Sequence, residues 1–121
     1  MTLEEIIQRL ESATGPDRTL DVEIALAVGY QRRAANSADT EQRVVWIRPD
    51  GSLPQKIPFF TAAVDDALAL VMRIAPDKSG GFSWESGVGS AKLGESQYVQ
   101  SVTPAIALCI AALKHKAYTG T

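Results

Sequence analysis

The chain has 121 residues, of which 45% are hydrophobic and 21% are charged, and its formal net charge is −2. A chain of this length forms one hydrophobic core, so we expect a single domain over residues 1–121. The slightly acidic balance provides no strong basic field, which argues against general nucleic-acid binding. No apolar run reaches the roughly 18 residues that a membrane helix needs, so we expect no membrane partner. The acidic N-terminus lacks the order of a signal peptide, and the single cysteine excludes an internal disulfide bond, so we expect a cytoplasmic protein.

Two helices are predicted at the start of the chain. The first covers residues 3–13, because Thr2 and Glu5 have the spacing of a capping box and apolar residues follow at helical spacing. A glycine and a proline at positions 15 and 16 end it. The second helix covers about residues 18–28, where Leu20, Ile24 and Val28 repeat every four residues.

The middle of the chain combines a predicted loop, a strand and a turn. Residues 30–42 lack periodicity and mix charged with small side chains, so we expect a long surface loop. Residues 43–48 are rich in β-branched and aromatic side chains and predict a strand. The sequence Pro-Asp-Gly-Ser at residues 49–52 predicts a turn. Residues 53–60 contain two prolines and form at best an edge strand or an extended connection.

The second half of the chain is predicted as helix, two strands and helix. Thr61 is expected to cap a helix over residues 61–74, whose core-facing residues are Val64, Leu68, Val71 and Met72. A turn at residues 76–81 leads to two short strands at residues 82–85 and 90–93. A short extended piece at residues 98–102 precedes the last helix. That helix covers residues 103–117, with Thr103 as its cap and Pro104 at its first position.

This order of elements predicts an α+β fold. Helices and short strands do not alternate strictly, which disfavours a sheet built from repeated strand–helix–strand units. We expect a small, mostly antiparallel sheet sandwiched between helices, in α/β/α layers.

Two sequence features invite a chemical interpretation but have a better structural one. Gly87 and Gly89 precede Lys92 without the spacing of a phosphate-binding loop, so they indicate the bend of a hairpin. Asp65 and Asp66 are adjacent in a predicted helix, where their side chains point about 100° apart. Their position in the first helical turn is explained by the helix dipole.

The only histidine and the only cysteine also have structural explanations. His115 lies near a helix end and has no partner at a recognisable metal-ligand spacing. Cys109 falls on an apolar helix face, where a thiol is buried and inert. We therefore predict no catalytic residues, no cofactor and no metal site.

Aromatic and arginine side chains are the best candidates for a binding surface. Trp46 and Trp84 lie on the two clearest strands, and alternation places Trp46 and Arg48 on the same face. Aromatic rings beside guanidinium groups suit nucleotides or an acidic partner. The alternative is that the tryptophans belong to the core and the arginines are solvated. The candidate ligand-binding residues are Arg32, Arg33, Trp46, Arg48, Phe60 and Trp84.

Three segments together carry a family resemblance. They are LDVEIALAVGY at residues 20–30, IPFFTAAVDDALAL at residues 57–70 and TPAIALCIAALK at residues 103–114. In sequence, order and spacing they resemble the phage ABA-sandwich domain family, which consists of small phage and prophage proteins. The resemblance implies a sheet sandwiched between helices and a phage or prophage origin, and it assigns no biochemical role.

The residues and the resemblance together predict a non-catalytic accessory protein of a phage or prophage. We expect it to act in the cytoplasm of the bacterial host by binding a host or phage protein, with a homodimer as a possible form. One alternative is a counter-defence protein that sequesters a small signalling nucleotide. A second alternative, an enzyme of unknown class, lacks a coherent set of acid, base, nucleophile or metal ligands.

Overall fold

The computed structural model describes residues 1–35, 43–53 and 56–119. Its elements are α1 (Leu3–Glu11), α2 (Arg18–Ala27), β1 (Gln31–Ala35), β2 (Arg43–Ile47), α3 (Val64–Ile74), β3 (Gly80–Glu85), β4 (Val88–Leu93), β5 (Val99–Ser101) and α4 (Pro104–Thr119). The strands form two antiparallel sheets, one of β1 and β2 and one in the order β3–β4–β5. The predicted α+β class, with antiparallel strands and helices packed on a sheet, is confirmed.

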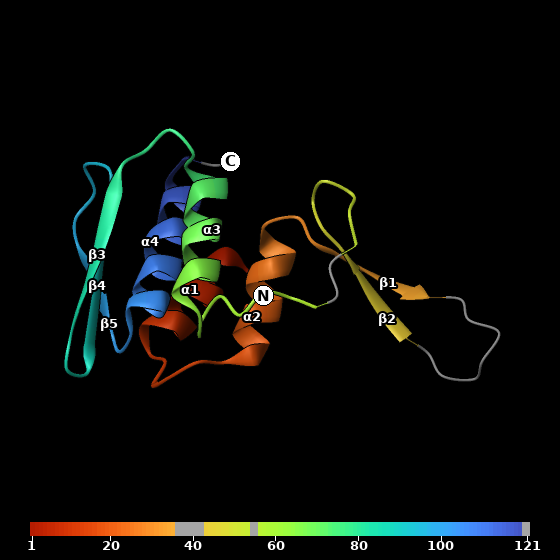
Figure 1. The fold of residues 1–121 in the computed structure, drawn as a ribbon, viewed down its shortest axis with the longest axis horizontal. Helices are drawn as coiled ribbons and strands as arrows, with labels where there is room; N and C mark the ends of the chain where they lie inside the picture. The colour runs from red at the N-terminus through yellow and green to blue at the C-terminus, as the bar shows by residue number, and fades with distance from the viewer. Residues whose placement is uncertain (36–42, 54–55, 120–121) are drawn as a thin grey trace.

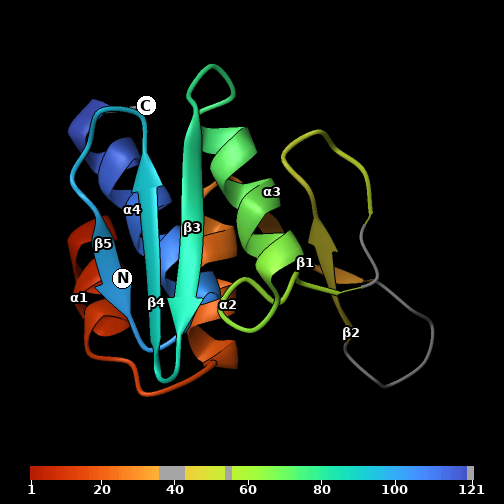
Figure 2. The same cartoon turned by 60° about the vertical axis from the view of Figure 1, so that its left-hand side comes forward.

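The four helices lie together on one side of the three-stranded sheet, as Figures 1 and 2 show. On that side β4 contributes the buried residues Gly89, Ala91 and Leu93. The opposite face carries a cross-strand row of polar residues, Ser83, Ser90 and Gln100. A polar face gives a helix no apolar surface to cover, so the helices pack on one face of the sheet only. The β1–β2 hairpin lies on the other side of the helices, which gives the order sheet, helices, hairpin (Figure 1).

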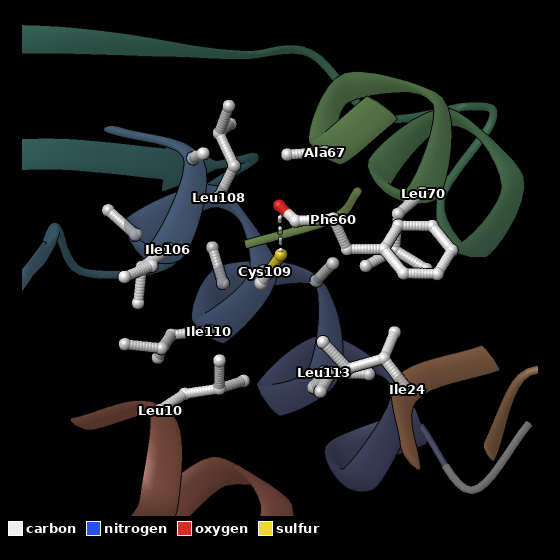
Figure 3. Close-up of a cluster of buried hydrophobic side chains, with 14 of the residues drawn as sticks. Leu10, Ile24, Phe60, Ala67, Leu70, Ile106, Leu108, Cys109, Ile110 and Leu113 are labelled. Atoms are coloured by element: carbon white, nitrogen blue, oxygen red, sulfur yellow. Dashed lines mark hydrogen bonds between the residues drawn. The ribbon is translucent and has the colours of Figure 1, made fainter. Parts of the chain in front are cut away.

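Helix α4 lies at the centre of the core, as Figure 3 shows. Every residue at positions 105–113 is buried, although the sequence predicted a single apolar face. The reason is that α1, α3 and β4 contact α4 from different sides, and its alanines allow a close approach. At Gly89 of β4, an added Cβ atom would lie 2.1 Å from the backbone nitrogen of Pro104, so glycine is required there.

Local capping fixes the starts of three helices. In α1 the amide of Glu5 donates to the Thr2 hydroxyl at 3.2 Å, which confirms the capping box. In α2 the Asp17 carboxylate accepts from the amide of Thr19 at 2.9 Å. In α4 the predicted cap Thr103 accepts from the backbone amide of Ile106 at 3.2 Å.

The prediction of a loop at residues 30–42 was wrong for its first part, because β1 lies there. Its register with β2 runs from Gln31 opposite Ile47 to Ala35 opposite Arg43. No local pattern marks β1 as a strand, and pairing with β2 supplies what its own sequence lacks. Residues 36–42 lie outside the described residues. The described part of residues 53–60 forms no strand and connects the turn after β2 to the segment before α3; residues 54 and 55 also lie outside.

The prediction that Thr61 caps α3 was also wrong. The N-cap of α3 is Ala63, which makes no side-chain capping bond. Thr61 is instead buried against α2, where the Asp21 carboxylate accepts from its amide and from its hydroxyl, both at 2.8 Å. The Arg18 guanidinium completes this network, since it donates to Asp21 at 3.0 Å and stacks on the Phe59 ring at 3.9 Å. These contacts hold the segment before α3 against the start of α2.

None of the helices in the described part of the chain combines the length and apolar character that crossing a bilayer requires.

Candidate functional site

The β1–β2 hairpin and its following turn, residues 31–35 and 43–52, carry several of the predicted site residues. We call this hairpin the arginine arm, and Figures 1 and 2 show it projecting away from the helices. Arg32 lies opposite Trp46 in the register, and its guanidinium lies over the indole with 4.9 Å to the ring centroid. Arg33 is exposed and lies opposite Val45, on the other face of the hairpin. No acidic side chain within the described ranges forms a salt bridge with either arginine.

The turn that follows β2 gives Arg48 a structural role. The amide of Gly51 donates to the Arg48 carbonyl at 2.8 Å, and Gly51 adopts a φ of +90°, which confirms the predicted turn. Asp50 accepts from the Ser52 hydroxyl at 2.7 Å and from the Ser52 amide at 2.9 Å. These two hydrogen bonds, the hydroxyl first, hold the pKa of Asp50 below its usual value, and the nearby Arg48 charge contributes. Arg48 is therefore partly balanced by Asp50.

The remaining two predicted site residues lie elsewhere in the fold. Phe60 is only 3% exposed and belongs to the core, where its carbonyl accepts from the Cys109 thiol at 3.2 Å (Figure 3). Trp84 is 71% exposed and lies on β3, in the other sheet. The structure thus brings Arg32 and Trp46 into contact, places Arg33 and Arg48 near them on the arm, and separates Phe60 and Trp84 from that group.

An apolar groove between α3 and β3 was not predicted. This α3–β3 groove has a volume of about 570 Å³, and its main apolar lining residues are Leu68, Val71, Met72, Phe82, Leu93 and Leu108. Helical spacing predicts Met72 in the core, and this is wrong, because Met72 is 63% exposed at the rim of the groove. Helical spacing identifies an apolar face, but it does not say whether another element of the same chain covers all of that face.

The cysteine is buried, whereas the histidine is half-buried beside two surface cavities. Burial raises the pKa of the Cys109 thiol, and the negative charge of Asp21 adds to that shift, so the thiolate nucleophile is suppressed. His115 lines two open surface cavities together with Tyr118, next to the end of α4. Among the residues that the structure describes, no group of three or more histidine, cysteine, aspartate or glutamate side chains could hold a metal ion.

Comparisons with protein-family models, curated proteins and solved structures found no match to this chain. The resemblance to the phage ABA-sandwich domain family therefore rests on the three segments themselves. In the structure these segments form α2, the stretch that leads into α3 and contains Thr61, and α4. They pack on one another, through the Asp21–Thr61 hydrogen bonds and the α3–α4 contact. The resembling residues are thus mainly core-forming.

Proposed function

We propose that this protein is a non-catalytic accessory protein of a phage or prophage, which binds a host or phage protein in the bacterial cytoplasm. The phage origin rests on the three resembling segments. Binding of a protein is supported chiefly by the α3–β3 groove, whose apolar lining is open at the rim where Met72 is exposed. Apolar surface that stays exposed in a folded protein is typical of a site that a protein partner covers.

Capture from a bacterial lysate tests this proposal with two variants of the same helix. Met72→Glu places a charge at the rim of the groove, whereas Ala69→Glu places the same charge on an exposed α3 residue outside the groove lining. We expect wild type and Ala69→Glu to capture a protein from the lysate that Met72→Glu does not capture. That protein, once purified, must bind wild type directly and bind Met72→Glu about tenfold or more weakly, which corresponds to ~1.4 kcal/mol. Equal retention by all three forms would sink the proposal.

A second candidate function, the binding of a small signalling nucleotide, is favoured by the arginine arm. A nucleobase stacks on an indole, and a guanidinium binds phosphate. The contact between Arg32 and Trp46 provides both groups side by side. Arg33 lies on the opposite face of the hairpin, so it does not add a second guanidinium to this pair.

A thermal-shift panel of cyclic and linear nucleotides tests the second candidate, because a ligand that binds only the native state raises its melting temperature. Nucleotide binding at Trp46 would be supported if a nucleotide raised the melting temperature of wild type and of Arg33→Ala but not that of Arg32→Ala. If no nucleotide shifts the melting temperature at millimolar concentration, this candidate is excluded.

A further inference from the structure

Among the described strands only β4 pairs with β3, so β3 is an edge of the three-stranded sheet, and the backbone groups that face outward from it can be assigned. The amide of Gly94 donates to the Ser79 carbonyl at 2.6 Å, and this pair continues the register in which Gly80 lies opposite Leu93. Hydrogen-bonded pairs alternate along antiparallel strands, so the backbone groups of Gly81, Ser83 and Glu85 also face β4. The N–H and C=O groups of the intervening residues Gly80, Phe82 and Trp84 therefore point away from the sheet.

The same three residues direct their side-chain positions toward the helices. Phe82 lies opposite Ala91, and Trp84 lies opposite Gly89, both of which are buried on the helix side of β4. Directly opposed residues in a sheet share a face. A strand added beside β3 would therefore point every second side chain toward α3, into the α3–β3 groove, and its other side chains toward solvent.

One end of the groove carries a free positive charge. Lys78 lines the groove where α3 has ended and β3 begins, and it is exposed. It forms no salt bridge with any side chain in the described part of the chain. A carboxylate on the bound segment would complement this charge.

We infer that the partner supplies an extended segment that adds to the edge of β3 as a fourth strand. The segment carries apolar side chains at alternate positions, which fill the α3–β3 groove, and a carboxylate at the end next to Lys78. The free N–H and C=O groups of Gly80, Phe82 and Trp84 select an extended backbone, since a helix or a compact ligand cannot satisfy them in a row. This inference rests on the proposed binding of a protein and names how that protein is recognised.

A random heptapeptide display library, selected against the intact chain, provides the probe. We expect the selected peptides to share apolar residues at every second position and an acidic residue or free carboxylate at one end. Binding of one such peptide is then measured by fluorescence anisotropy with Trp84→Ala, which removes only the side chain, and with Trp84→Pro, which also removes the outward N–H. That N–H does not bond β4, so proline at this edge position leaves the sheet intact, and circular dichroism of both variants checks this.

The inference predicts that Trp84→Pro weakens peptide binding about tenfold or more beyond Trp84→Ala, and that Lys78→Ala weakens it for peptides with the carboxylate. Equal binding by the two Trp84 variants would rule out strand addition. In that case the protein-binding proposal still stands if Met72→Glu loses its captured partner. Failure of the library to yield any peptide that depends on Met72 would overturn the inference. The inference would also be overturned if the wild-type protein had the molar mass of a dimer in solution and Trp84→Pro had that of a monomer. The edge of β3 would then be occupied by a second copy of this chain.

Discussion

Replacing Thr61 with valine tests whether the buried polar network holds the segment before α3 onto α2. The Thr61 side chain is 1% exposed, and its hydroxyl accepts from the Asp17 amide at 2.9 Å and donates to the Asp21 carboxylate at 2.8 Å. Valine has nearly the same shape, so the substitution leaves no large cavity. It removes the hydrogen bonds of the hydroxyl and leaves the Asp17 amide without this acceptor.

The expected loss follows from the two hydrogen bonds. A bond to a charged group contributes about 1.5–3 kcal/mol and one between neutral groups about 1 kcal/mol. The Asp21 carboxylate keeps two donors, the Thr61 amide and the Arg18 guanidinium, so it is not left without partners. We therefore expect the free energy of unfolding to fall by about 2.5–4 kcal/mol, a large share of the ~5–15 kcal/mol of a typical domain.

Urea unfolding followed by far-UV circular dichroism measures this loss. Thr19→Val is the matched control, because Thr19 is exposed on α2 and only its backbone amide takes part in the cap. We expect that control to stay within about 0.5 kcal/mol of wild type. If Thr61→Val unfolds at the same urea concentration as Thr19→Val, the network does not hold the two parts together.

Three further outcomes are expected. Gly89→Ala should lower the free energy of unfolding by ~3 kcal/mol, because the added Cβ would overlap the backbone where α4 begins. Gly81→Ala is the control, since its Cβ meets nothing within 4 Å, and it should change the free energy of unfolding by less than ~1 kcal/mol; equal urea midpoints for the two variants would contradict this. In NMR titrations the pKa of Asp50 should lie below 3.8 and should rise in Ser52→Ala, and an unchanged pKa in that variant would refute the assignment. Because the folded-state pKa is the lower one, the ionised carboxylate stabilises the fold at any pH above its unfolded-state pKa. This stabilisation is lost as the pH falls through the folded-state pKa. Cys109 should react with a thiol reagent only as fast as the protein unfolds, so immediate labelling of the native protein would show that it is not buried.

Part of the candidate site could be predicted from the sequence because strand alternation is local information. The strand at Trp46 and its neighbouring turn were identified from β-branched residues and from Pro-Asp-Gly-Ser. Arg32 is also a candidate from the sequence, but only the register of β1 with β2 shows that it contacts Trp46. Phe60 and Trp84 illustrate the opposite case, since both are aromatic residues chosen as binding candidates, yet they differ in burial, 3% against 71% exposed.

The sequence by itself determined the approximate extent of the helices, the caps of α1 and α4 and the β3–β4 hairpin, because capping bonds, glycine turns and apolar spacing act over a few residues. Tertiary structure alone decided three other features. It made a strand of β1, which has no pattern of its own, and it used Thr61 to bind Asp21 in place of capping a helix. It also left Met72 and the edge of β3 uncovered by any element that the structure describes. Each of these depends on which distant segment arrives as a neighbour, and a local pattern does not contain that information.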